Sequence, residues 1–349
     1  MAQQLLDPPA QAVQQHKETL KDFEPMLARY RRPEAWRSVW QIVTTLALFF
    51  TTWTLAYLSL SVSYWLTLLL SIPAGLSVVR LFIIQHDCGH RSFFKSKSAN
   101  DWVGSFLSVL TFTPYHCWRR EHAAHHATSG DLDRRGRGGE IWTMTVKEYQ
   151  EASWKRRLLY RLYRNPFVLL TIGSIFHFVV MQRLTVNLPK ARTVERRSIH
   201  WTNFWLAITL VSAGWLLGPM NLIAVQLPTF AFAATVGVWM FYIQHQYEDA
   251  FWTTAEDWDY VKAAMEGSSY YRLPKVFQWF TANIGLHHIH HLDSRIPNYH
   301  LQKCHDANPE FHRAIQFSFT ESLPCIFLKL WDEDQKQMIR FKDLPKASK

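Results

Sequence analysis

The chain has 349 residues, 48% of them hydrophobic, and carries 38 Lys and Arg against 28 Asp and Glu, a formal net charge of +10. This hydrophobic content excludes an intrinsically disordered chain, and 13 Gly and 15 Pro exclude a collagen-like one. Four Cys with no CxxC pair exclude a disulfide-stapled scaffold. The composition leaves open whether the protein is soluble or membrane-bound, and why it contains 17 His.

Two long apolar stretches, residues 41–84 and 204–243, interrupt the charged sequence. The first contains Arg80 as its single basic residue, and residues 203–261 contain none. Each stretch is long enough for two helices that cross a hydrocarbon core about 30 Å thick, joined by the uncharged tripeptides SVS and PMN. The sequence therefore predicts an all-α integral membrane protein with four transmembrane helices.

The basic residues predict the orientation of these helices. Cytoplasmic segments of membrane proteins carry an excess of Lys and Arg, and here the amino tail, the middle segment and the carboxyl tail hold almost all of them. We therefore expect both termini on the cytoplasmic side of a membrane, most simply the inner membrane of a bacterium. Basic and acidic residues interleave in all three segments, which does not form the basic stripe of a nucleic-acid-binding protein, so no nucleic-acid partner is predicted.

Shorter apolar segments add detail to this topology. Residues 15–37 have apolar positions at helical spacing and predict an interfacial helix before the first span. Residues 102–114 and 167–182 are too short to span and predict interfacial or re-entrant helices. The remaining charged segments are predicted to be cytosolic. The predicted boundaries are 1–40 for the amino tail, 41–85 and 203–243 for the two hairpins, 86–202 for the middle cytosolic segment, and 244–349 for the last cytosolic segment with the carboxyl tail.

Most of the histidines lie in four places beside the cytoplasmic ends of the predicted spans. Residues three or four apart on a helix share a face, so the spacing HxxxH lets His86 and His90 bind one centre, and the spacing HxxHH puts three imidazoles of a helix on one face. A lone histidine at a membrane surface is usually solvated, but three such clusters on one side of a bilayer favour two metal ions with four or five nitrogen ligands each. Imidazole binds Fe, Zn, Cu and Ni, so the ligands alone do not name the metal. The predicted ligands are His86, His90, His122, His125, His126, His245, His287, His290 and His291.

Polar residues next to these clusters are candidates for contacts that orient the imidazoles. Carboxylates and carbonyls commonly fix the tautomer of a ligating histidine. His288 is turned away from the ligand face and is expected to act as such a neighbour, while Asn283 either positions a metal-bound water or caps a helix. His177 lies inside an apolar stretch and is interpreted as a packed or cavity residue. The candidate neighbours are Asp87, Glu121, Asp131, Asn283, His288 and Asp293.

Three motifs resemble the histidine boxes of membrane fatty acid desaturases: HDCGH at 86–90, HAAHH at 122–126 and HHIHH at 287–291. The longer segments HDCGHRSFF, HHATSGDLDRRG and NIGLHHIHHLDSRIPNY are most similar to the bacterial and plastid Δ12 or ω-6 acyl-lipid branch. The resemblance implies four membrane-spanning helices under a cytosolic cap that holds two iron ions, and a hydrophobic tunnel for an acyl chain. It implies that the box histidines are iron ligands and that His245 is an additional ligand.

The reaction that the resemblance implies is the insertion of a cis double bond into an acyl chain, at Δ12 or ω-6 of an 18-carbon monounsaturated acyl lipid. Methylene C–H bonds have no acidic proton, so general-base chemistry cannot begin the reaction and an oxidant derived from O2 is required. The sequence has no GxGxxG after a strand and no HPGG haem segment, which implies a separate ferredoxin- or cytochrome-like electron donor. The substrate is expected to be an acyl lipid or an acyl thioester.

Two other functions stay open on the sequence. A fatty acid hydroxylase or acetylenase of the same di-iron superfamily would carry the same boxes. A membrane metal transporter or sensor would instead have its histidines along a path through the membrane midplane, whereas these lie beside the spans on one side. The absence of ExxH and HExxH motifs argues against a carboxylate di-iron bundle and a zinc peptidase.

Overall fold

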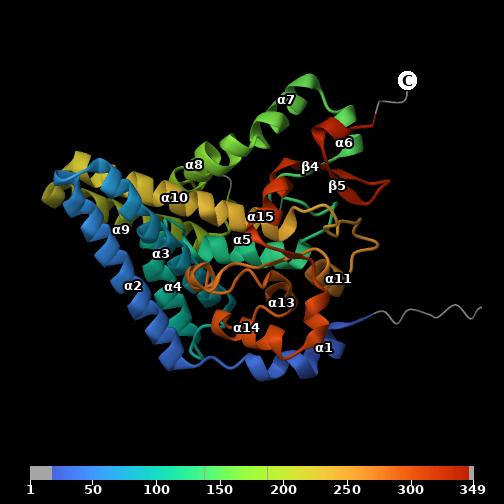
Figure 1. The fold of residues 1–349 in the computed structure, drawn as a ribbon, viewed down its shortest axis with the longest axis horizontal. Helices are drawn as coiled ribbons and strands as arrows, with labels where there is room; N and C mark the ends of the chain where they lie inside the picture. Colours follow the sequence, from blue (N-terminus) through green and yellow to red (C-terminus); the bar gives the residue numbers. More distant parts are fainter. Residues whose placement is uncertain (1–17, 137, 187, 346–349) are drawn as a thin grey trace, which may run out of the picture.

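The computed structural model describes residues 18–136, 138–186 and 188–345. Long helices gather at one end of the molecule, and short helices and strands gather at the other (Figure 1). The long helices are α2 (Ala35–Leu58), α3 (Tyr64–His90), α9 (Thr193–Leu217) and α10 (Pro219–His245). Between α3 and α9 the chain forms α4 (Lys97–Thr111), α5 (Tyr115–Thr128), α6 (Val146–Glu151), α7 (Trp154–Tyr163), the π-helical turn η3 (Val168–Gly173), α8 (Ser174–Val179) and the 3₁₀ turn η4 (Met181–Arg183).

The elements before α2 and after α10 build most of the cap. Before α2 lie α1 (Leu20–Leu27) and η1 (Ala28–Tyr30). Outside the cap, η2 (Ser59–Ser61) follows α2. The helices and turns after α10 are α11 (Tyr260–Met265), α12 (Lys275–Phe280), α13 (His287–Leu292), α14 (Asn298–Asp306), η5 (Pro309–Arg313), α15 (Phe319–Ser322), η6 (Leu323–Phe327) and η7 (Phe341–Asp343).

Five short strands correct the prediction that the fold is purely α-helical. They are β1 (Met144–Thr145), β2 (Tyr270–Tyr271), β3 (Gln316–Phe317), β4 (Leu328–Asp332) and β5 (Gln337–Arg340). β4 lies between a parallel β1 and an antiparallel β5, and β2 pairs with β3 in parallel. Runs of two to five residues are too short to produce a readable alternation of apolar and polar residues. The fold is therefore mostly helical, with two small sheets in the cap.

Three helices in the described residues are long and apolar enough to cross a membrane: α2 with η2, α3 and α10. α9 has the length of a span, but its first turns contain Glu195, Arg196 and Arg197, and it is not among the three. A bent pair, α7 followed by η3–η4 at 73°, would raise the number to four if it counts as one broken span. Large apolar side chains at the ends of the hairpins support a lipid environment, since Trp65 is 81% exposed and Trp215 is 84% exposed.

The two hairpins turn within a few residues, as the uncharged tripeptides predict. α2 and α3 meet at η2, and α9 passes into α10 through Gly218, whose φ of +86° favours glycine. Pro219 then occupies the first turn of α10, where its missing N–H has no cost. Gly75 permits close packing of α3 on α10, because a Cβ there would lie 2.8 Å from the carbonyl oxygen of Thr229.

The described part of the predicted amino-terminal interfacial helix packs on protein. Its residues 15–17 lie outside the described residues, and α1 buries Phe23 and Leu27 in a core with Ile289 and Leu292 of α13. An amphipathic helix needs one apolar partner surface, and here the cap supplies it. The amino-terminal segment is therefore part of the scaffold behind α13.

The short apolar segments of the middle region flank the long helices. α4 and η3–α8 pack against α3 and α10 respectively, and the hydroxyl of Thr235 in α10 donates to the carbonyl of Leu170 in η3 over 2.7 Å. The Arg80 guanidinium in α3 donates to the Trp279 carbonyl of α12 and lies 4.1 Å from the centre of the Trp279 indole ring.

The contacts of Arg80 hold α12 of the cap against α3.

Candidate metal centre

The structure brings all nine predicted ligands together where α3 and α10 meet the cap. His86 and His90 end α3, His245 ends α10, and the other six lie on α5 and α13. They form two groups, and within each group the nearest ring nitrogens all lie within 4.8 Å of one another. The first group is His86, His90, His122, His126 and His290, and the second is His125, His245, His287 and His291.

Helices α5 and α13 each contribute to both groups. On α5 the pair His122 and His126 turns to the first group, while His125 turns to the second. On α13 the pair with i,i+4 spacing, His287 and His291, belongs to the second group, and His290 belongs to the first. One turn of helix thus supplies ligand atoms to two centres, which places the two centres side by side.

The spacing of the ring nitrogens is that of a coordination shell. In the second group, Nε2 of His245 lies 3.1 Å from Nε2 of His125 and 3.0 Å from Nε2 of His287. In the first, Nε2 of His126 lies 3.1 Å from Nε2 of His122 and 3.0 Å from Nε2 of His290. Two nitrogens about 2.1 Å from one transition-metal ion, at a right angle, are about 3.0 Å apart. A cation at each centre would therefore satisfy lone pairs that otherwise face one another.

Unpartnered nitrogens lead to the same conclusion. Nε2 of His86 and Nε2 of His90 are buried and have no hydrogen-bond partner among the described residues. A buried polar atom without a partner is costly unless a ligand satisfies it. Burial also lowers the pKa of His122, His290 and His291 well below that of free histidine, with neighbouring imidazoles acting in the same direction. These rings are neutral at pH 7, as metal ligation requires.

Two of the ligands have their orientation fixed by a second contact. Nδ1 of His245 donates to the carbonyl of Gly267 over 2.9 Å, so its proton is on Nδ1 and the Nε2 lone pair faces the other imidazoles. Nδ1 of His86 lies 3.1 Å from Oδ1 of Asp87. The other carboxylate oxygen of Asp87 accepts from the backbone and side-chain nitrogens of Asn298 at 2.7 and 2.9 Å. Asp87 therefore links α3 to the start of α14 while it contacts the imidazole.

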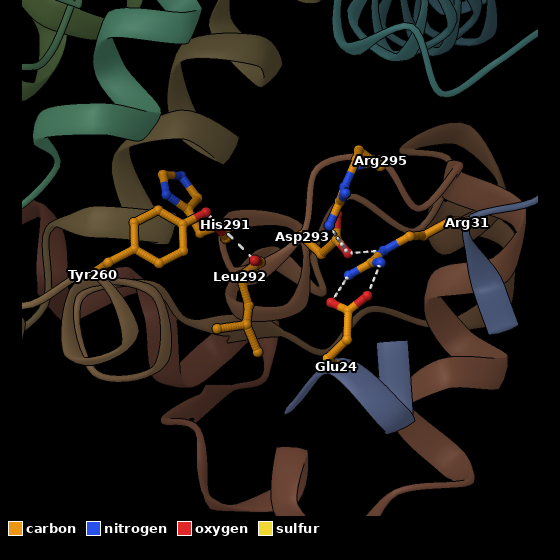
Figure 2. Close-up of polar contacts among 7 residues, drawn as sticks. All are labelled: Glu24, Arg31, Tyr260, His291, Leu292, Asp293 and Arg295. Atoms are coloured by element: carbon orange, nitrogen blue, oxygen red, sulfur yellow. Dashed lines mark hydrogen bonds and ion pairs between the residues drawn. The ribbon is translucent and has the colours of Figure 1, made fainter. Parts of the chain in front are cut away.

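Asp293 lies beside the third histidine box, which predicts a contact with an imidazole, but its partners in the structure are arginines. It pairs with Arg295 over 2.8 Å and with Arg31, which also pairs with Glu24 of α1 (Figure 2). The same view shows Tyr260 beside α13, where its hydroxyl donates to the carbonyl of His291 over 2.6 Å. Asp293 thus ties the amino-terminal segment to the end of α13 and acts on the position of the helix.

The remaining predicted neighbours form no hydrogen bond, ion pair or ring contact with a ligand imidazole in the described structure. Asp131 is buried and accepts the N–H groups of Asp133 and Arg134, which closes the turn after α5. Asn283 has a φ of +57° and donates to the carbonyl of Asn298. His288 is fully buried outside both groups. Glu121, finally, lines the cavity described below.

Three contributors to the site have no pattern in the sequence. Oε1 of the buried Glu140 side chain lies 3.8 Å from Nδ1 of His125. The indole of Trp118 stacks on the imidazole of His122 with ring centres 4.5 Å apart. Gly138 lies so close to α5 that a Cβ would be 2.4 Å from the backbone nitrogen of His125. Glu140 and Gly138 lie in the loop between α5 and β1, and tertiary contact alone assigns them to the site.

An apolar cavity of about 290 Å³ adjoins both histidine groups. It is lined at one end by His86, His122 and His287, and it continues between α3 and α10 to Phe230. Along α10, fourteen residues separate Phe230 from Gln244, which is about 21 Å at 1.5 Å per residue. Twelve Val, Ile, Leu, Phe and Ala residues of α3, α10 and η3–α8 contribute the apolar part of the lining. A long, thin, apolar ligand fits this space.

Fold and site together define a membrane protein with a histidine-rich centre for metal ions at the end of an apolar cavity. The model of the fatty acid desaturase family matches residues 63–321, and the chain belongs to that family. It is therefore an oxidoreductase of lipid metabolism.

Relatives cover most of the chain. A protein named fatty acid desaturase from Bacillus subtilis (strain 168) is 43% identical over 94% of this chain and 92% of its own length. An sn-1 acyl-lipid omega-3 desaturase (ferredoxin) from Synechocystis is 29% identical over 72% of this chain and 70% of its own length. An sn-1 oleoyl-lipid 12-desaturase from Anabaena variabilis is 25% identical over 87% and 86%.

Proposed function

We propose that the protein is an acyl-lipid desaturase that inserts a cis double bond at Δ12, equivalent to ω-6, in an 18-carbon monounsaturated acyl chain. The observation that carries the proposal is the apolar cavity that adjoins both histidine groups. The position of the double bond rests on relatives named oleoyl-lipid 12-desaturase, at 25% and 27% identity. The 43% identical relative has a name without a position.

The proposed cofactor is two iron ions, one in each histidine group, and the nine imidazoles fit that role. Bound iron, with O2 and two electrons, supplies the oxidant that removes hydrogen from an unactivated methylene. The neutral imidazoles offer their Nε2 lone pairs, and the Gly267 carbonyl holds the His245 tautomer that makes this possible. The apolar lining and the indole of Trp118 exclude water and orient the chain beside His86 and His122. Removal of two hydrogens then consumes O2, two electrons and two protons and releases two waters.

A separate electron donor, ferredoxin- or cytochrome-like, completes this proposal. The name of the Synechocystis relative includes ferredoxin, and this chain carries a net charge of +10 that would attract an acidic redox protein. The substrate is proposed to be an acyl lipid, with an acyl thioester as the other carrier.

The proposed topology has four spans, α2, α3, α9 and α10, with the cap and both termini on the cytoplasmic side of a bacterial inner membrane. α9 has 25 residues, about 37 Å of helix, so it can cross a 30 Å core with its charged first turns at the surface. The excess of basic residues outside the two hairpins supports this orientation.

Expression in a host that makes only monounsaturated fatty acids tests the function. We expect a new diene with its second double bond at carbon 12, found by gas chromatography and mass spectrometry of derivatised double bonds. A hydroxylated or acetylenic product would support the hydroxylase or acetylenase instead. A new double bond elsewhere would leave the desaturase and contradict the Δ12 position. No product from a membrane-inserted, iron-loaded protein supplied with a donor would contradict the function.

A further inference from the structure

One pair of polar side chains in the cavity has no role in the metal centre. His177 of α8 and Gln182 of η4 both line the apolar cavity, and Nε2 of Gln182 lies 3.1 Å from Nε2 of His177. Gln182 is 7% exposed, whereas His177 is exposed. Phe178, between them in the chain, contacts the ring of Phe230 at 6.2 Å between centres. The pair therefore lies toward the Phe230 end, away from the histidine groups.

Three other polar side chains of the lining are bonded to protein. Thr111 donates to Gln85, Ser174 donates to the carbonyl of Leu170, and Gln244 donates to the carbonyl of Ile284. For His177 and Gln182, their mutual contact is the one hydrogen bond that the described structure records. Because an amide nitrogen donates, the His177 Nε2 accepts and the ring proton is on Nδ1. The Nδ1–H of His177 and the second amide hydrogen of Gln182 remain available to a ligand.

The backbone around this pair is held from two sides. Arg183, next to Gln182, donates to the carbonyl of Phe112 at the end of α4 over 2.6 Å. The side chain of Asn203 in α9 donates to the Arg183 carbonyl over 3.0 Å. η4 is therefore fixed against α4 and α9, and the two side chains have a defined place in the cavity rather than that of a loose surface pair.

We propose that His177 and Gln182 donate hydrogen bonds to the acyl carbonyl of the substrate, and that the double-bond position is therefore counted from the carboxyl end. The methylenes of an acyl chain are alike, so an apolar lining does not select which carbon lies beside the metal centre. The carbonyl is the group of the chain that can accept a hydrogen bond. Donors held at one place in the cavity therefore fix the position of the chain along it. This inference rests on the proposed function, and it applies to the carbonyl of a lipid ester or of a thioester.

Chain length provides the first test, and it uses the unmodified protein. A host enriched in 16-carbon or in 18-carbon acyl chains expresses the full chain, and the new double bond is located by mass spectrometry. We expect the same number from the carboxyl end in both lengths. A constant number from the methyl end would overturn the inference while leaving desaturation intact. Pulse labelling of phospholipid and acyl-CoA pools distinguishes the two carriers by which pool first contains the product.

Variants provide the second test. In the double variant His177→Phe with Gln182→Leu, we expect the product to spread over neighbouring positions, with the main isomer falling at least about threefold as a fraction of total product. His177→Gln keeps a donor and should restore much of the fidelity. Val179→Leu, on α8 and outside the cavity lining, is the matched control and should give the wild-type isomer. Iron content per protein should be unchanged in all of them.

The outcomes separate the two proposals. An unaltered isomer pattern in the double variant, with active wild type, would overturn the role of the pair. Absence of any new double bond in wild type would count against the proposed function instead. If the double variant does not accumulate, the single variant His177→Phe tests the pair by the same isomer pattern, and the chain-length experiment on wild type tests the counting from the carboxyl end.

Discussion

Two buried polar clusters of this protein differ in how far their nitrogens find hydrogen-bond partners within the protein. The guanidinium of Arg164, fully buried beside the end of α10, makes five hydrogen bonds through its two terminal nitrogens. Its partners are carbonyls, hydroxyls and an amide oxygen of the protein itself: Trp142, Thr143, Tyr242, Gln246 and Leu328. In the metal centre, seven imidazoles have ring nitrogens about 3 Å from one another, and Nε2 of His86 and Nε2 of His90 have no partner in the described structure.

The difference distinguishes structural from functional burial. The terminal nitrogens of Arg164 meet protein acceptors and so hold α7, α10 and β4 together, while its Nε has no partner among the described residues. Buried nitrogen acceptors that converge on one point have lost their hydrogen bonds to water, and a bound cation compensates for that loss. Burial alone would rank the two clusters equally, whereas the accounting of hydrogen-bond partners separates them.

The largest effect is expected from removing a ligand. His125→Ala leaves the second histidine group with three imidazoles, so we expect the iron content to fall by about half and the desaturated product to fall below detection, while the protein still inserts into membranes. Metal analysis and lipid analysis measure the two. His200→Ala, at an exposed position of α9 outside both groups, is the control. Full activity of His125→Ala would contradict its assignment as a ligand.

Removing the Arg164 guanidinium should affect stability and leave the metal in place. Arg164→Met leaves buried carbonyls and hydroxyls without their donor, and we expect a loss of about 3 kcal/mol of unfolding free energy. Thermal and denaturant unfolding in detergent measure it, with exposed Arg157→Met as control. Iron per folded molecule should stay at the wild-type value. Loss of iron from a variant that is still folded would show that Arg164 also supports the metal centre.

Replacing a carboxylate that contacts a ligand should have an intermediate effect. In Asp87→Asn the charge beside Nδ1 of His86 is lost, and we expect about 10- to 100-fold weaker metal binding. Competition with a chelator measures the affinity. Asp257→Asn, an exposed acid of the cap, should bind metal like the wild type. Equal affinity of both variants would show that Asp87 serves the contact with Asn298 alone.

The smallest effect concerns pH. Burial lowers the pKa of Lys329 in β4 to about 7, from an ordinary value of 10.5, and the charge of Arg164 acts in the same direction. Between pH 7 and 10.5 the unfolded chain therefore binds more protons than the folded one, so this residue makes stability rise with pH, by at most about 1.4 kcal/mol per pH unit. Lys329→Met should flatten the rise of melting temperature between pH 7 and 9. Exposed Lys155→Met should keep the wild-type slope, and parallel curves for all three proteins would contradict the assignment.

Prediction from sequence succeeds where the signal is local. The spacing HxxxH or HxxHH puts imidazoles on one helical face whatever surrounds the helix, and the structure brings all nine of the selected histidines together. Apolar stretches of span length likewise predict α2, α3 and α10, and they leave α9, with its charged start, less defined. Adjacency in sequence identified the contact of Asp87 with His86. Adjacency did not identify the partner of Asp293, because that partner, Arg31, is 262 positions away in the chain.

Helical period and hydrophobic length are properties of short segments, so the sequence alone predicts a helical membrane protein with two long apolar hairpins and histidines grouped for metal binding. The structure adds that α5 and α13 each serve both centres, that Gly138 and Glu140 adjoin His125, and that His177 and Gln182 line the cavity. These facts depend on the relative placement of helices distant in the chain. That placement follows from the packing of the whole molecule, which no local pattern contains.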